Sequence, residues 1–93
     1  MEISRREIDR VFTKFEAIET RCAHHRRGLV PDIDGKILFP IHTSEGKSLH
    51  GRAAFSFIKS TGLTNEEFKE FVKCTLSREA ALKRIKQRSA RDY

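Results

Sequence analysis

The feature that most constrains the fold is a change in the spacing of apolar residues along the chain. The first part carries apolar residues at the i, i+3, i+4, i+7 spacing of one helix face: Ile8, Val11, Phe12 and Phe15. Ser4 and Glu7 precede this face at the spacing of a capping box, in which each side chain accepts a hydrogen bond from the other residue's backbone N–H. We therefore predict a helix over residues 5–15.

The middle of the chain has the period of two that is typical of strands. Apolar and polar residues alternate over residues 18–22, which predicts a half-buried strand, and a second extended stretch covers residues 24–31. The Asp-Gly pair at 34–35 is a strong hairpin-turn signal, and an apolar strand follows over residues 36–43. Pro40 lies in that last strand and has no N–H to donate, which places the strand at a sheet edge or a bulge.

The last part of the chain returns to helical spacing. A second helix is predicted over residues 49–61, and Gly62 is its natural C-cap. The buried face of this helix is expected to hold five residues: Leu49, Ala53, Ala54, Phe57 and Ile58. Thr64 and Glu67 form another capping box, which predicts a short third helix.

Three strands between helices predict an α+β fold in which an antiparallel sheet carries the helices on one face. The other face would be open to solvent, where a ligand can lie. We expect the domain to cover residues 1–76 and residues 77–93 to form a basic helical C-terminal extension. The chain has 93 residues, which allows one modest core and no large enclosed cavity. Any activity should therefore lie on a surface or in a shallow groove.

The chain is basic, with a formal net charge of +6. Such a charge favours an anionic partner, although it also serves solubility alone. No apolar run approaches the roughly 18 residues of a membrane span, and the N-terminal residues lack the apolar stretch of a signal peptide. We therefore expect a cytoplasmic protein without a membrane partner. Cys22 and Cys74 are expected to be free thiols there, although a disulfide between them is possible.

Two histidines followed by two arginines are the strongest candidates for chemistry. His24 and His25 open the second strand, and Arg26 and Arg27 follow at once. Imidazole gives and takes protons near neutral pH. Attack of an RNA 2′-hydroxyl on the neighbouring phosphate needs such a group, and cations to stabilise the charge, but no metal. The sequence therefore suggests metal-independent RNA cleavage, and the alternative is a solvated basic strand.

Other kinds of site find little support in the sequence. There is no GxGxxG motif and no P-loop, and the five residues of metal-ligand type match no zinc spacing: Cys22, His24, His25, His42 and Cys74. We therefore expect no metal and no small-molecule cofactor. Phe55 departs from the buried pattern of its helix and is either a partner contact or packed against the C-terminal helix. The basic residues over 83–91 either contact a phosphate backbone or form a solvated helix end.

The order of these features resembles the HicA family of toxins. The resemblance covers roughly residues 5–70 and rests on the following segments: His24-His25, Asp34-Gly35, Pro40-Ile41-His42, Lys47-Ser48-Leu49, Ile58-Lys59 and Gly62-Leu63-Thr64-Asn65-Glu66-Glu67-Phe68. It implies a fold like a double-stranded-RNA-binding domain, α-β-β-β-α, and ribosome-independent cleavage of mRNA. It also implies neutralisation by a HicB-like antitoxin protein. It assigns the catalytic histidine to His24, where the family motif reads Gly-Ser-His and Cys22-Ala23 stand here in place of Gly-Ser.

This interpretation makes the chain an mRNA interferase, an endonuclease of a toxin–antitoxin system. Besides His24, the candidate RNA-binding residues are His25, Arg26, Arg27, Lys36 and Lys47. Two alternatives use the same fold. One is a module that binds RNA without cutting it, and the other is an interaction module whose basic surface contacts an acidic protein.

Overall fold

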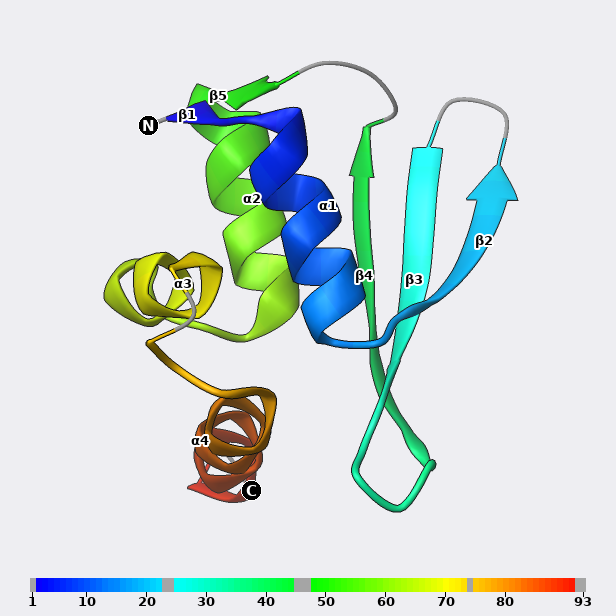
Figure 1. Cartoon of the computed structure of the whole chain (residues 1–93), viewed down its shortest axis with the longest axis vertical. Coiled ribbons are helices and arrows are strands. Elements are labelled where there is room, and N and C mark those ends of the chain that lie inside the picture. Colours follow the sequence, from blue (N-terminus) through cyan, green and yellow to red (C-terminus); the bar gives the residue numbers. More distant parts are fainter. Residues whose placement is uncertain (1, 23–24, 45–47, 74, 92–93) are drawn as a thin grey trace.

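The computed structural model describes residues 2–22, 25–44, 48–73 and 75–91. Within these ranges the chain forms four helices, a three-stranded antiparallel sheet and one short additional strand pair (Figure 1). The elements follow one another as β1 (Glu2–Ile3), α1 (Arg5–Lys14), β2 (Ile18–Cys22), β3 (His25–Pro31), β4 (Ile37–Ser44), β5 (Leu49–His50), α2 (Gly51–Thr61), α3 (Asn65–Val72) and α4 (Arg78–Arg91). The predicted α+β class and the antiparallel sheet are therefore confirmed.

Helix α1 begins where the capping box predicts. The hydroxyl of Ser4 accepts the N–H of Glu7 at 3.2 Å, and the carboxylate of Glu7 accepts the N–H of Ser4 at 3.0 Å. The predicted apolar face is buried along its whole length. Phe15, which the sequence places inside the helix, is its buried C-cap.

Strands β2, β3 and β4 pair in chain order, so β4 lies at an edge of the sheet, as Pro40 predicts. Helix α1 packs closely on the middle of β3 at Gly28. A Cβ atom at this position would lie 2.9 Å from the Cβ of Ala17 and 2.9 Å from the Cε2 of Phe12. The close approach of α1 to the sheet therefore requires glycine at position 28.

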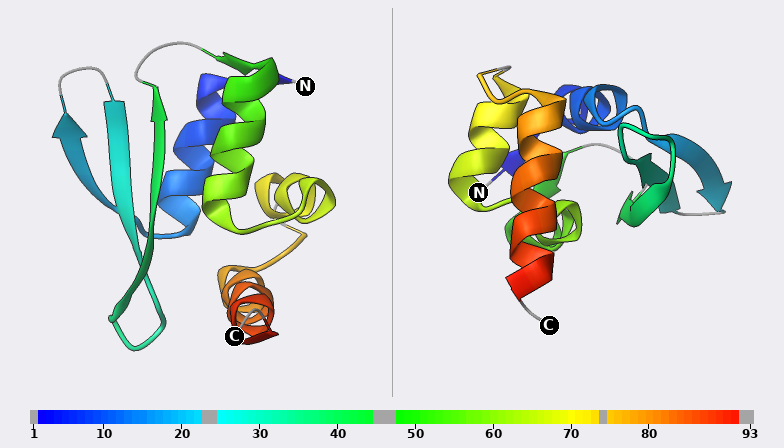
Figure 2. Two further views of the ribbon diagram at one scale, coloured as in Figure 1. Left: turned by 180° about the vertical axis from the view of Figure 1, so that it is seen from behind. Right: turned by 90° about the horizontal axis from the view of Figure 1, so that it is seen from below.

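All four helices of the described chain lie on one side of the sheet in the views of Figures 1 and 2. Val30 of β3 and Ile41 of β4 point to this side and are fully buried. The predicted half-buried pattern is wrong for the described side chains of β2, because Ile18 is 54% exposed and Glu19 and Thr20 are exposed as well. Ile18 lies opposite Leu29 on the face that the helices do not cover, and β2 is the edge strand farthest from the helices in Figure 1.

A short antiparallel pair, β1–β5, joins the N-terminal residues to the start of α2. The sequence predicts a helix from residue 49, but Leu49 pairs with Ile3 and α2 begins only at Gly51. Ile3 is 2% exposed and Leu49 is 6% exposed, so this pair closes the core at that end. A two-residue strand has no measurable period, and the apolar character of Leu49 fits a helix face equally well.

The boundary between α2 and α3 follows the sequence prediction. Gly62 ends α2 in the left-handed region with φ at 77°, and Thr64 and Glu67 form the capping box of α3. The buried face of α2 differs from the prediction at two positions. Ala53 is exposed, whereas Thr61, which the prediction does not include, is fully buried.

A single buried cluster joins the helices to the sheet. The ring of Phe15 lies 4.4 Å from that of Phe71 and 6.0 Å from that of Phe39, so it links α1 to α3 and β4. Helix α4 contributes three residues to the same cluster: Ala81, Leu82 and Ile85. The apolar side of the C-terminal helix thus shares its core with the rest of the chain.

Candidate functional site

The two adjacent arginines of β3 lie on opposite faces of the sheet. Arg26 points toward α1, where its guanidinium contacts the carboxylates of Asp9 and Glu19 and lies 4.2 Å over the ring of Phe12. Burial alone would lower the pKa of Arg26, but hydrogen bonds to Glu19 and Asp9 raise it above its usual value. Arg26 is therefore neutralised within the fold, and its main contacts are intramolecular.

Arg27 occupies the open face. In the register of the sheet its two cross-strand partners are Thr20 on β2 and His42 on β4, and all three residues are exposed. Directly opposed residues on one face of an antiparallel sheet have Cβ atoms about 4.5–5.5 Å apart. Within the described residues, neither the side chain of Arg27 nor that of His42 has a hydrogen-bond or ion-pair partner. We call Thr20, Arg27 and His42 the open-face row.

An apolar row borders the open-face row. It consists of Leu29 with its cross-strand partners Ile18 and Pro40, and each lies two positions from the member of the open-face row on its own strand. None of the six residues in the two rows is acidic. The acidic residue of β2, Glu19, contacts Arg26 on the helix side instead. The described part of the open face therefore combines cationic and apolar side chains and suits an anionic ligand.

The remaining predicted site residues are not gathered around Arg27. His24 and Lys47 lie outside the described residues, and His25 is described only by its backbone, which pairs with Cys22 and Ser44. Lys36 is exposed in the turn that precedes β4. Six residues separate it from His42, about 20 Å along an extended strand, so Lys36 lies at the other end of the sheet.

Four basic residues of α4 contact other elements of the protein: Arg78, Arg84, Lys86 and Arg88. Arg84 and Arg88 both contact the carboxylate of Glu67, at 3.4 Å and 2.9 Å. Burial alone would raise the pKa of Glu67, but hydrogen bonds from Arg88, from the N–H of Thr64 and from Arg84 lower it to about 2. The N-terminal cap of α3 and the basic side of α4 therefore share one carboxylate.

Two further ion pairs connect α4 to the sheet side of the molecule. Arg78 contacts Glu16 at 2.8 Å, and Lys86 contacts Asp32 at 3.0 Å. The N–H of Ile33 and the ammonium of Lys86 both hydrogen-bond to Asp32 and lower the pKa of that carboxyl. These contacts favour a structural role for the basic end of the chain over a phosphate-binding one.

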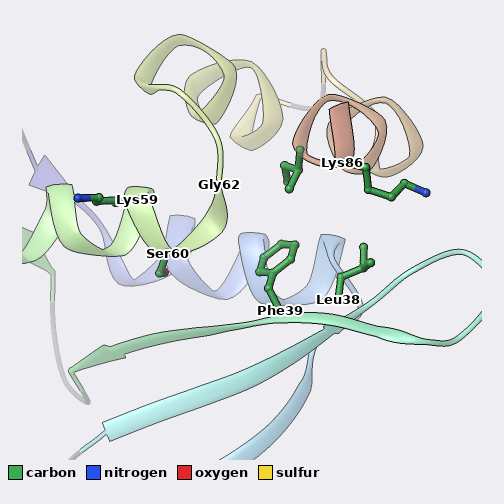
Figure 3. A pocket seen from close by; sticks show the side chains of 7 residues that line it. Leu38, Phe39, Lys59, Ser60, Gly62 and Lys86 are labelled. Carbon is green, nitrogen blue, oxygen red and sulfur yellow. The ribbon is translucent and has the colours of Figure 1, made fainter. Parts of the chain in front are cut away.

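A groove of about 420 Å³ lies between β4, the end of α2 and α4 (Figure 3). Its lining residues are Leu38, Phe39, Lys59, Ser60, Gly62, Ile85 and Lys86. In Figure 3, Leu38 and Phe39 point from β4 toward α4, whereas the amines of both lysines point away from the space. The groove therefore has apolar walls and offers no pair of groups for acid–base chemistry.

Phe55 projects from the outer side of α2 and is 51% exposed. It does not pack in the core beside α4, so of the two expectations for this residue the contact with α4 loses support. No three His, Cys, Asp or Glu side chains in the described part of the chain come together in a way that could hold a metal ion. No helix among the described residues is both long enough and apolar enough to cross a membrane.

Comparison of the chain with family models, with curated proteins and with solved structures gives no match. The class is therefore defined by the fold itself, as a small α+β protein whose antiparallel sheet is covered by helices on one face. The sequence prediction did not place His42 beside Arg27. Next to the turn Pro31 pairs with Ile37, and a register shift between Val30 and Pro31 then brings Arg27 opposite His42, so this pairing depends on an irregularity that the Asp-Gly signal does not reveal.

Proposed function

We propose that this protein binds RNA on the open face of its sheet and cleaves it without a metal ion, as HicA toxins do. The observation that carries the proposal is the open-face row. It presents an imidazole beside a guanidinium that has no ion pair with any described residue, with a hydroxyl on the other flank and no acidic residue in its own or the bordering row. A phosphodiester fits this arrangement because Arg27 can hold its oxygens through two parallel hydrogen bonds.

The proposed reaction is attack of the RNA 2′-hydroxyl on the adjacent phosphate, with proton transfer by histidine. His24, which immediately precedes β3 in the sequence, is the histidine that the resemblance to HicA assigns to this role. Arg27 stabilises the charge that develops on the phosphate oxygens. The finer assignment of the fold, an α1-β2-β3-β4-α2 core like that of a double-stranded-RNA-binding domain, and a cytoplasmic location belong to the same proposal.

The proposed partner is a HicB-like antitoxin that covers the open face, because an unrestrained RNA-cutting domain would poison its own cell. Support comes from the exposed large apolar residues. Three of the four among the described residues lie on the sheet or its connecting turn: Ile18, Ile33 and Ile37, which are 48–55% exposed. Ile18 belongs to the apolar row of the open face, where an exposed apolar side chain can contribute to a protein contact. Co-expression with the product of the neighbouring gene should give a stable complex in which His24 is protected.

A second candidate function is RNA binding without cleavage. The same row favours it, because Arg27, His42 and Thr20 can hold a phosphate without transferring any proton. The two functions differ in what a histidine substitution does.

The deciding experiment is cleavage of an end-labelled RNA by the parent protein, His24→Ala and His25→Ala in the presence of EDTA. The parent should cleave, and His24→Ala should lose about 10²–10⁴-fold in rate, which is the usual contribution of a positioned proton-transfer group. Thermal melts of all three proteins control for folding, and a binding assay controls for RNA affinity. Equal cleavage by the parent and His24→Ala would remove the assigned role of His24. A parent that binds RNA but leaves it intact would establish the second candidate function.

A further inference from the structure

We infer that His42 is a second catalytic histidine, which transfers a proton to or from the RNA held by Arg27. The inference rests on the proposed function and adds to it a second proton-transfer residue, while Arg27 binds the phosphate. Its basis is the position of His42 directly opposite Arg27, on the exposed face of two paired strands.

The pairing places the guanidinium of Arg27 and the imidazole of His42 close enough to contact the same phosphate. The Cβ atoms of such a directly opposed pair are about 4.5–5.5 Å apart, and their side chains stand on the same face of the sheet. Both side chains reach solvent, and neither is occupied by a partner within the described part of the chain. A phosphate on the guanidinium of Arg27 would therefore lie within reach of the imidazole of His42.

The surroundings of His42 differ from those of the other fully described histidine, His50. The Nδ1 of His50 lies 3.2 Å from the carboxylate of Glu2, and its Nε2 lies 3.4 Å from the hydroxyl of Ser48. His50 is also part of the β1–β5 pair, away from the three-stranded sheet. It therefore provides a matched control, since it is an exposed histidine on a strand but has no arginine beside it.

The register also brings His42 to the part of the sheet where β3 begins. Ser44, two residues after His42 on β4, pairs with His25, the residue that follows His24. Diagonal neighbours across two antiparallel strands are about 7–8 Å apart at the backbone, which is the expected separation of His42 from position 25. The start of β3 and the end of β4 thus lie at the same end of the sheet as His42.

Cleavage by internal attack requires two proton transfers, and each transfer can be made by a different histidine. The 2′-oxygen forms a bond to phosphorus while its proton passes to a base. The bond between phosphorus and the 5′-oxygen breaks, and that oxygen takes a proton from an acid. The products are a 2′,3′-cyclic phosphate and a free 5′-hydroxyl, so the step balances without water, metal or a second substrate. His42 performs one of these transfers while Arg27 holds the phosphate.

The test measures single-turnover cleavage across pH for the parent, His42→Ala, His42→Asn and His50→Ala, with EDTA present throughout. Both His42 variants should lose about 10²–10⁴-fold in rate, because neither alanine nor asparagine replaces a proton-transfer group. One limb of the pH–rate profile should disappear with them. RNA affinity and thermal stability should stay close to those of the parent, because Arg27 is retained and His42 is exposed. His50→Ala should cleave like the parent.

Three outcomes would overturn the inference. The first is parental cleavage by His42→Ala with both limbs of the profile intact, which leaves the proposed function standing if His24→Ala is inactive. The second is a rise in KM with an unchanged kcat, which would make His42 a binding residue only. The third is a parent that cleaves no RNA under any condition, which would refute the proposed function and this inference together.

Discussion

The two neighbouring arginines of β3 lie on opposite faces of the sheet and differ in their contacts. On the helix-covered face, Arg26 lies over an aromatic ring and is neutralised by two carboxylates. On the open face, Arg27 lies between a threonine and a histidine and has no acidic partner among the described residues. The two residues are identical in type and adjacent in sequence, so the difference comes only from which face each one occupies. Net charge therefore does not locate a binding surface, because a cation can be neutralised within the fold.

Some cations of the helices also make structural contacts, as Arg26 does. On α1, the ammonium of Lys14 donates to the carbonyl of Phe71 at 2.7 Å, and the guanidinium of Arg10 donates to that of Val72 at 2.9 Å. On α4, Arg88 and Lys86 are ion-paired. These contacts stabilise the fold, whereas Arg52 and Lys59 on α2 are exposed and have no ion pair among the described residues. What distinguishes the open face is the pairing of Arg27 with His42 and the absence of acidic residues from its two described rows.

The largest effect on stability is expected at Gly28, on the helix-covered face. Gly28→Ala would bring a methyl group against Phe12 and Ala17, so α1 must move away from β3. We expect a loss of about 1–3 kcal/mol in the free energy of unfolding, which is typical of overpacking. Urea denaturation followed by circular dichroism measures it. Thr20→Ala on the open face is the control and should stay within about 0.5 kcal/mol of the parent. Equal losses for both variants would break the comparison between the two faces.

The features that the sequence predicts well are those set by neighbouring residues. Both capping boxes and the Gly62 helix end depend on residues within four positions of each other, and all three are confirmed. The exposure of Ile18 was not predicted, because an alternating sequence pattern shows that a strand has an apolar face and a polar face. It does not show which of the two faces the helices cover. The neutralisation of Arg26 was missed because Asp9 lies 17 positions away and meets it only through the packing of α1.

The next effect compares the two arginines directly. Arg26→Ala should cost about 1–2 kcal/mol of unfolding free energy, because it removes a cation–π contact and leaves two carboxylates without their partner. Arg27→Ala should leave stability within about 0.5 kcal/mol. RNA binding should show the reverse. Arg27→Ala should weaken binding and reduce the salt dependence, with the log–log slope shallower by about 0.7 for one lost phosphate contact on a single strand. Binding that weakens in Arg26→Ala alone would reverse the assignment of faces.

The smallest effect concerns Glu67, which links α3 to α4. Its pKa is lowered to about 2 in the folded protein, from a usual value of 4.5, so the folded state favours the charged carboxylate. The resulting stability is present above pH of about 4.5 and is lost as pH falls toward 2. Glu67→Gln should lower the free energy of unfolding by about 1 kcal/mol at neutral pH and flatten the decline in this acid range.

Acid titration of thermal stability measures this effect. Glu66→Gln is the matched control, because Glu66 is the neighbouring residue on α3, is exposed and makes no ion pair within the described chain. A Glu67→Gln protein that keeps the acid dependence of the parent would show that α4 is held by its apolar face alone.

The most direct test of the central claim is to map where RNA binds by the shifts of backbone amide resonances during titration with a short single-stranded RNA. A binding site on the open face predicts that the largest shifts occur at Thr20, Arg27 and His42, and that they diminish together as salt is added. The outer face of α2, with Arg52 and Lys59 exposed, should shift little. Shifts concentrated on α2 or α4, with the three strand residues unchanged, would contradict the account.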